Sequence, residues 1–173
     1  WSSDVCSSDL DTFNPFSLKG APAEGTGLMY ENLMVASGDE PFTHYCFLCQ
    51  TVEVAPDNAW VEYKMRPEAK FSDGSAITAD DVAFSYTTLT EKGGPTFRFY
   101  YEDVAKVEVR DPKTVRFTFK VKTNKELPLI LGQLPILSKA YWSKRDFTAT
   151  SLDIPVSSGP YTVDTFEVEI GRA

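Results

Sequence analysis

The segment from Ala69 to Tyr86, AKFSDGSAITADDVAFSY, constrains the fold more than any other part of the sequence. Its Asp73-Gly74 pair is a strong turn signal. Thr78 marks a helix start, because its hydroxyl can accept a hydrogen bond from a free backbone N–H and Asp81 follows at the spacing of a capping box. We therefore predict a turn and then a helix that begins at Thr78 and ends before Gly93-Gly94-Pro95.

The acidic pair Asp80-Asp81 in this segment has two interpretations. The two side chains could act as a general acid and a general base. Adjacent residues on a helix point about 100° apart, however, so their carboxyl groups cannot readily flank one substrate. Both lie in the first helical turn, where the helix dipole stabilises negative charge. We favour the capping role for this pair.

Alternating apolar and polar residues predict strands on both sides of this helix. The first two are Thr51–Val54 and Trp60–Met65, and a β-hairpin follows at Val104–Val109 and Thr114–Phe119. Short helices are predicted at Leu28–Leu33, Glu126–Leu134 and Lys139–Lys144. Because strands and helices are mixed without a regular β–α–β rhythm, the predicted fold class is α+β or mixed α/β.

Composition excludes several classes of protein. The 173 residues contain 42% hydrophobic residues, enough for a core, and no apolar run approaches a membrane span of about 20 residues. The net charge of −8 argues against a nucleic-acid partner, because phosphate binding needs clustered Lys and Arg. The sequence has a single histidine, which cannot support most zinc sites. We expect no metal site and no cofactor.

The two ends of the sequence differ from its middle. Residues 1–10, WSSDVCSSDL, repeat Ser-Ser-Asp and lack the basic and apolar regions of a signal peptide, so we interpret them as foreign to the protein. At the other end, the alternation of Val163, Thr165, Phe166 and Val168 predicts a strand still in progress. We expect the chain to be a fragment, so the missing signal peptide carries no information on localisation.

The segment HYCFLC contains His44, Cys46 and Cys49. A Cys behaves as a small buried hydrophobe, and simple packing is the interpretation that we favour. An intramolecular disulfide is the second interpretation. The spacing would also suit a thiol-redox pair or half of a metal site, although no second pair of ligands follows.

Three further segments are candidates for a site. Lys19 to Glu24, KGAPAE, is either a surface turn or a ligand contact. The cluster Phe97–Tyr101 is either core packing or an aromatic wall of a cleft, since Tyr offers a flat face and a hydroxyl. Ser157 and Ser158 could include a nucleophile, but the G-x-S-x-G motif is absent and a turn is favoured.

The order of several short motifs resembles the solute-binding proteins of ABC importers, in the family 5 group that carries oligopeptides, dipeptides and nickel. The motifs are Asn14-Pro15-Phe16, Tyr30-Glu31-Asn32-Leu33, Trp60 to Gly74, Thr78 to Val82, Val107 to Phe117, and Ser158-Gly159-Pro160-Tyr161. Each motif alone is weak, but the series is specific and covers nearly everything after residue 10. Residues 127–135, LPLILGQLP, look most like a peptide-binding branch that includes a microcin-import component.

This resemblance implies a two-lobed periplasmic-binding-protein type II fold, of which the chain holds one incomplete lobe. Residues 11–32 would begin lobe I, residues 33–147 would form the extra subdomain of the peptide-binding group, and residues 148–173 would return into lobe I. The implied protein is a periplasmic or lipid-anchored monomer that binds a peptide-like solute and delivers it to ABC permease subunits. It would perform no chemistry on its ligand.

The resemblance also assigns candidate ligand contacts. In related proteins the segment that matches Lys19, Gly20, Ala21, Pro22, Ala23 and Glu24 lines the cleft, and an aromatic residue from the region of Tyr100 and Tyr101 faces it. An extended peptide suits such a cleft, because it binds through main-chain hydrogen bonds that any sequence can make. Two alternatives are a nickel- or haem-type solute binder on the same scaffold and a small thiol-redox domain that uses Cys46 and Cys49.

Overall fold

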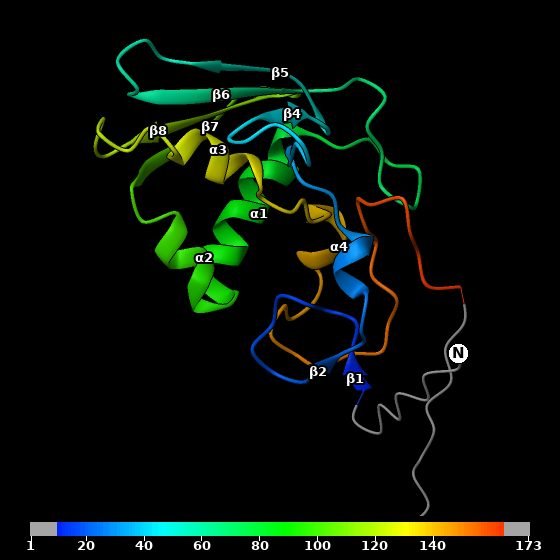
Figure 1. The fold of residues 1–173 in the computed structure, drawn as a ribbon. Coiled ribbons are helices and arrows are strands. Elements are labelled where there is room, and N and C mark those ends of the chain that lie inside the picture. The colour runs from blue at the N-terminus through cyan, green and yellow to red at the C-terminus, as the bar shows by residue number, and fades with distance from the viewer. Residues whose placement is uncertain (1–9, 165–173) are drawn as a thin grey trace, which may run out of the picture.

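The computed structural model describes residues 10–164, and its largest element is a four-stranded antiparallel sheet. The strands are β5 (Cys49–Val54), β6 (Trp60–Met65), β7 (Val104–Asp111) and β8 (Thr114–Phe119), arranged in the order β5-β6-β8-β7. Three helices, α1 (Ala79–Lys92), α2 (Pro95–Tyr100) and α3 (Leu127–Gly132), all lie on one face of this sheet (Figure 1). Together these elements form what we call the sheet end of the molecule.

The sheet forms because its central strands alternate between two environments. Val61, Tyr63 and Met65 of β6 are fully buried against the helices, as the period of two predicts. On the opposite face, Glu62 and Arg116 are register partners on β6 and β8, and their side chains form an ion pair of 2.9 Å. The predicted strands and the predicted hairpin are thus confirmed, with β5 beginning two residues earlier and β7 ending two residues later than expected.

Helix α1 begins as its capping motif predicts. Thr78 is the N-cap, and the capping box with Asp81 is present. The Asp81 carboxylate accepts hydrogen bonds from the Thr78 backbone N–H at 2.9 Å and from the Thr78 hydroxyl at 2.6 Å. It also accepts one from the backbone N–H of Lys139 at 3.0 Å, which fixes the start of a distant helix, α4 (Lys139–Trp142), against α1.

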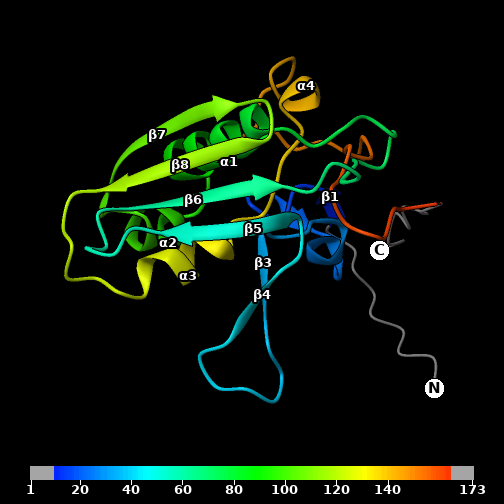
Figure 2. The ribbon, with the colours of Figure 1, turned by 90° about the horizontal axis from the view of Figure 1, so that it is seen from above.

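The rest of the chain forms short elements at the other end of the molecule (Figure 1). β1 (Leu10–Thr12) pairs in parallel with β2 (Ala21–Pro22), and a 3₁₀ turn, η1 (Thr26–Met29), follows. The antiparallel pair β3 (Met34–Ala36) and β4 (His44–Cys46) forms a hairpin that projects from the body (Figure 2). We call β1, β2, α4 and residues 143–155 the cavity end.

One local prediction was wrong. The expected helix at Leu28–Leu33 is instead the 3₁₀ turn η1 at Thr26–Met29, because Leu33 turns into the core with no exposed surface and the chain then extends into β3. The predicted end of α1 before Gly93-Gly94 is confirmed, and α2 begins directly after it, since Pro95 occupies the first helical position, where no backbone N–H is needed. The predicted last strand falls mostly on residues 165–173, outside the described residues.

Candidate functional site

The segment Lys19–Glu24 lies at the cavity end, and all of it except half-buried Ala23 is exposed. Its central residues form β2, and the Ala21 N–H donates to the Asp11 carboxylate at 2.7 Å. Gly20 has a φ of +86°, and a Cβ there would stand only 2.4 Å from the Asp11 carboxylate oxygen. Glycine is therefore required at position 20 for the chain to turn back toward β1.

An exposed two-residue strand is a plausible edge for main-chain pairing with an extended ligand. The edge offers few donors, because Pro22 has no backbone N–H and the Ala21 N–H is already bonded to Asp11. Lys19 and Glu24, at the two ends of the segment, are exposed charges of opposite sign that suit the two termini of a peptide. Ligand contact by these six residues stays a prediction.

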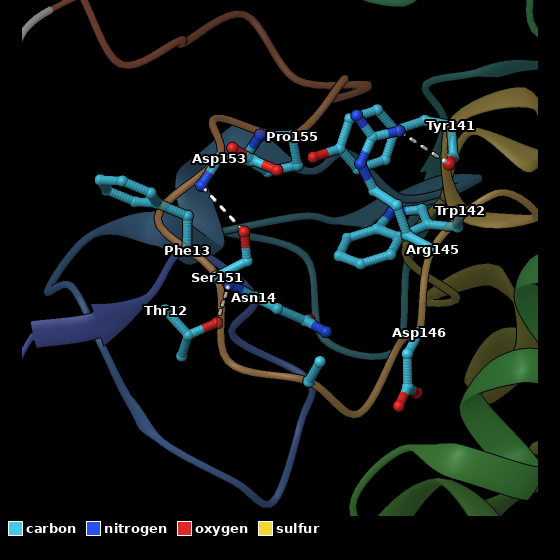
Figure 3. A pocket seen from close by; sticks show the side chains of 11 residues that line it. Thr12, Phe13, Asn14, Tyr141, Trp142, Arg145, Asp146, Ser151, Asp153 and Pro155 are labelled. Carbon is cyan, nitrogen blue, oxygen red and sulfur yellow. Dashed lines mark hydrogen bonds between the residues drawn. The ribbon is translucent and has the colours of Figure 1, made fainter.

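A cavity of about 180 Å³ lies in the same end of the molecule (Figure 3). Two segments line it that are far apart in the sequence, Thr12–Asn14 and residues 141–155. They are joined by hydrogen bonds from the Phe13 N–H to the Ser151 carbonyl at 3.1 Å and from the Asn14 side-chain amide to the Phe147 carbonyl at 2.9 Å. The cavity is thus a property of the tertiary fold, not of one local motif.

One wall of the cavity is aromatic and carries a cationic group. The guanidinium of Arg145 lies 3.9 Å from the centroid of the Tyr141 ring, and the Tyr141 and Trp142 rings are 5.1 Å apart. The Trp142 indole Nε1 is buried without a hydrogen-bond partner, and so is the Tyr30 hydroxyl. Burial strongly raises the pKa of Tyr30, and the nearby Trp142 indole opposes this rise without reaching hydrogen-bonding geometry.

The cavity and the Lys19–Glu24 segment are electrostatically connected. Asp146 lines the cavity, and its pKa is lowered below 3.8. The main causes are hydrogen bonds from the Thr148 backbone N–H and hydroxyl, both at 2.9 Å, and Lys19 contributes a smaller attraction. Lys19 therefore lies close enough to the cavity rim to influence a charge there.

The structure separates the two tyrosines that the sequence could not distinguish. Tyr101 is only 4% exposed, and its ring lies 5.8 Å from Tyr86 in the core. Burial is the main cause of its strongly raised pKa. Tyr100 is 52% exposed, and both tyrosines line a hollow of about 330 Å³ with Phe97, Ile130 and Gln133. Of the pair, Tyr100 is the residue whose side chain is available to a ligand.

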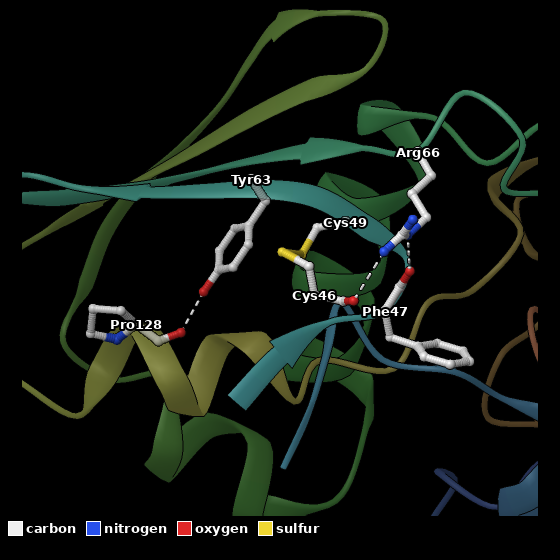
Figure 4. Close-up of a disulfide and its surroundings, with 6 residues drawn as sticks. All are labelled: Cys46, Phe47, Cys49, Tyr63, Arg66 and Pro128. Carbon is white, nitrogen blue, oxygen red and sulfur yellow. Dashed lines mark hydrogen bonds between the residues drawn. A yellow bond between two sulfur atoms is a disulfide. The ribbon is translucent and has the colours of Figure 1, made fainter. Parts of the chain in front are cut away.

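Cys46 and Cys49 form a disulfide, with a Cα–Cα distance of 5.0 Å (Figure 4). The interpretation favoured from sequence, two unpaired cysteines packed in the core, is therefore wrong. Cys49 is nevertheless fully buried in the core. Arg66 braces the same turn, donating to the carbonyls of Phe47 at 2.7 Å and of Cys46 at 3.3 Å. Because a redox-active thiol needs access to its substrate, the burial of Cys49 does not favour a thiol-redox role.

The remaining candidates have structural partners. The favoured capping role of Asp81 agrees with its hydrogen bonds, and Asp80 forms an exposed ion pair with Lys139 at 2.9 Å. Ser157 is fully buried, and its carbonyl accepts from the Ser72 N–H at 2.8 Å, although its hydroxyl has no hydrogen-bond partner among residues 10–164. The Ser158 hydroxyl accepts from the Glu31 N–H at 3.0 Å. Within residues 10–164, no three His, Cys, Asp or Glu side chains come together in a way that could hold a metal ion.

Sequence reasoning missed Tyr141, Trp142 and Arg145. The only local signal is the run YWSKR, which combines two aromatic residues with two basic ones and begins inside the short helix predicted at Lys139–Lys144. Nothing in the sequence shows that this run faces Thr12–Asn14, because the two segments are separated by most of the chain. In the described part of the chain, no helix is long and apolar enough to cross a membrane.

Comparison with known proteins agrees with this fold. The sequence pattern of the bacterial extracellular solute-binding proteins, family 5 Middle, matches residues 41–170. The chain is 42% identical over 165 residues to the peptidoglycan-binding protein YepA of Agrobacterium fabrum, covering 90% of this chain and 27% of YepA. It thus spans about a quarter of the length of this relative.

Solved structures share the same architecture. The periplasmic oligopeptide-binding protein of Thermotoga maritima aligns with a TM-score of 0.74 at 26% identity, over 92% of this chain and 30% of that protein. NikZ of Campylobacter jejuni, solved in complex with Ni(L-His), aligns with a TM-score of 0.73 at 20% identity, over 92% of this chain and 32% of NikZ, which shows the fold alone. The mixed fold is that of a periplasmic-binding-protein type II fragment, as predicted, and the chain belongs to the bacterial extracellular solute-binding proteins of family 5.

Proposed function

We propose that the protein containing this chain captures a peptide-like solute and delivers it to the permease of an ABC importer. The match of residues 41–170 to the family 5 solute-binding proteins carries this proposal. The chain would supply part of one lobe, and a second lobe would close over the bound ligand. Binding would then shift the protein toward its closed state.

The ligand would contact the Lys19–Glu24 segment and Tyr100. The segment is exposed and extended at β2, which suits main-chain pairing with a peptide of any sequence. Tyr100 adds an exposed ring and hydroxyl beside the hollow that Gln133 also lines. Tyr101 would support this wall from the core.

Two names among the similar proteins favour a peptide-like ligand over other solutes. YepA is described as peptidoglycan-binding, and the similar protein of Thermotoga maritima is described as oligopeptide-binding. The Thermotoga maritima protein has also been solved with mannohexaose bound, so the support for a peptide-like ligand comes from the two names and not from a shared bound ligand. The nickel-bound NikZ shares only the fold at 20% identity, so the nickel- or haem-type alternative has weaker support.

The proposal includes a location and a mode of action. The protein would work as a monomer outside the cytoplasm, in the periplasm or on a lipid anchor, and would meet its permease at the membrane. It would release its ligand unchanged. Hydrolysis of a bound peptide by the purified full-length protein would contradict this part of the proposal.

Titration of the full-length protein with a library of short peptides tests the proposal. We expect micromolar or tighter binding of at least one peptide class. Tyr100→Ala should weaken that binding about fivefold, because an aromatic contact contributes roughly 1 kcal/mol. Phe99→Ala is the matched control, since Phe99 is an exposed neighbour on α2 that does not line the hollow.

The same titration has two contradicting outcomes. Stoichiometric nickel or a haem chromophore in the purified protein, with no peptide bound, would replace the peptide proposal by its alternative. Equal losses from Tyr100→Ala and Phe99→Ala would remove Tyr100 from the site and leave the proposed function standing.

A further inference from the structure

The cavity between Thr12–Asn14 and residues 141–155 has a chemistry that the proposed peptide contacts do not use. Its lining in the described residues comes from Thr12–Asn14 and residues 141–155. Its volume of about 180 Å³ has room for roughly ten water-sized groups, which is the size of a small metabolite. The question is which charges and surfaces such a molecule would meet.

A cationic group is available on one side of the cavity. Arg145 donates from Nη1 to the Tyr141 carbonyl at 3.4 Å and stacks over the Tyr141 ring, which orients its planar guanidinium. None of the ion pairs among residues 10–164 includes Arg145. A guanidinium held in this way retains free donors and suits bidentate binding of a carboxylate.

An anionic group is available on the same side. Asp153 lines the cavity, and its carboxylate likewise forms no ion pair among the described residues. Arg145 and Asp153 both act on the Tyr141 hydroxyl, Arg145 by lowering its pKa and Asp153 by raising it, although burial is the larger cause of the net rise. Figure 3 shows the three side chains along one side of the cavity.

The two charges therefore lie near one point, the Tyr141 hydroxyl. A ligand that complements them both must carry a carboxylate and an ammonium close together. That arrangement is an α-amino acid, whereas the two termini of an extended peptide lie farther apart. The ring of Trp142, which also lines the cavity, offers an apolar surface for an aliphatic side chain.

We propose that this cavity binds a free α-amino acid with an apolar side chain, with Arg145 holding its carboxylate and Asp153 its ammonium group. The site is separate from the Lys19–Glu24 segment and from Tyr100, and it does not depend on the proposed peptide transport. Because the site is small and open, the dissociation constant falls in the millimolar range.

Nuclear magnetic resonance of the full-length protein, selectively ¹⁵N-labelled at tryptophan, tests this site with L-leucine as the probe. Trp142 lines the cavity, and its indole N–H has no hydrogen-bond partner among residues 10–164, so its signal is sensitive to a molecule bound there. Trp60, which packs under Arg116 on the sheet, is the internal control. We expect a saturable shift of the Trp142 signal and no shift of the Trp60 signal.

Ligand analogues and matched variants complete the test. Leucinamide lacks the carboxylate and N-acetyl-leucine lacks the ammonium, and each should bind at least about tenfold more weakly than leucine. Arg145→Gln and Asp153→Asn should each weaken leucine binding to a similar extent. Lys144 is an exposed neighbour outside the cavity lining, so Lys144→Gln should leave the affinity for leucine unchanged.

Three outcomes would overturn the site. They are the absence of a Trp142 shift, equal binding of leucine by the Arg145→Gln variant, and equal shifts of the Trp60 and Trp142 signals. Peptide capture by the full-length protein without leucine binding here would refute this inference alone. Leucine binding here with no solute captured by the full-length protein would refute the proposed function alone.

Discussion

The sheet end and the cavity end of this chain are built in different ways. The sheet end buries long apolar rows, in which Val61, Tyr63, Met65, Val115 and Phe117 have no exposed surface. The cavity end is assembled from two- to four-residue elements and polar loops around an open hollow. The comparison teaches that the strands of the sheet supply stability, while the proposed ligand contacts lie outside them, at the cavity end and at Tyr100 on α2.

Removing a ring from the sheet end should have the largest effect. Phe117 is fully buried on β8, with its ring 6.0 Å from Tyr63 and 5.6 Å from Tyr86. Phe117→Ala should lower the free energy of unfolding by about 3–5 kcal/mol, because it removes a large side chain and leaves a cavity. Urea denaturation measures this loss.

Arg145→Gln is the control at the cavity end. It should lower the free energy of unfolding by less than about 1 kcal/mol, because Arg145 is exposed and has no ion-pair partner in residues 10–164. Similar losses for the two variants would break the distinction between a stabilising end and a ligand-facing end.

Asp81 connects the sheet end to the cavity end through its hydrogen bonds. Its replacement should cause the second-largest loss in the free energy of unfolding. It is 7% exposed and accepts hydrogen bonds from Thr78 and from the Lys139 N–H at the start of α4. Asp81→Asn should lower the free energy of unfolding by about 2 kcal/mol, because a buried charged acceptor loses its charge and part of its capacity.

Asp80→Asn is the matched control for this prediction. Asp80 forms only an exposed ion pair with Lys139, and such pairs contribute about 0–1 kcal/mol. Thermal unfolding of the two variants under one set of conditions gives the ranking. An equal or smaller loss for Asp81→Asn would show that the hydrogen bond to Lys139 does not hold the two ends together.

The disulfide should have the third effect. Reduction of Cys46–Cys49 should lower the free energy of unfolding by about 1–2 kcal/mol, because the bond closes only a very short loop and so restrains the unfolded chain little. Urea titrations with and without reductant measure the change, and the number of titratable thiols should rise by two on reduction. The Cys46→Ala/Cys49→Ala variant should not respond to reductant, and an unchanged thiol count would refute the pairing.

The smallest effect on stability should come from two exposed carboxylates, one at the sheet end and one at the cavity end. Asp111 at the β7–β8 turn and Asp146 at the cavity both have a pKa below 3.8, mainly because each accepts a backbone N–H within its own turn. Since the folded pKa is below the unfolded value, each contributes stability above about pH 4 that is lost as the pH falls further. NMR titration should place the pKa of both carboxyl groups below 3.8. An ordinary pKa for either residue would show that its carboxylate does not accept the backbone N–H within its turn.

The sheet end could largely be predicted from the sequence, and the cavity end could not. Trp60–Met65 and Thr114–Phe119 match their strands, because a period of two directly encodes one buried face. The Thr78 cap was also predictable, because its partner Asp81 is only three residues away and the capping box is therefore a local pattern. The cavity depends on hydrogen bonds such as that from Asn14 to the Phe147 carbonyl, and no local pattern encodes that contact.

Local ambiguity explains the other differences. Tyr100 and Tyr101 are adjacent and chemically alike, so only the packing of α2 decides which one is buried. The spacing of Cys46 and Cys49 is compatible with packing, with a disulfide and with metal binding, and the geometry of the turn between β4 and β5 selects the disulfide. The domain boundaries, the peptide-contacting residues and the microcin-importing branch stay predictions.

Hydrogen–deuterium exchange of the full-length protein, with and without a saturating peptide, tests the central claim most directly. If the strands of the sheet supply stability while the ligand contacts lie outside them, the peptide should slow exchange in residues 19–24 and around Tyr100 and leave β6 and β8 unchanged. Protection confined to β6 and β8, or no change at all with saturating peptide, would contradict the account.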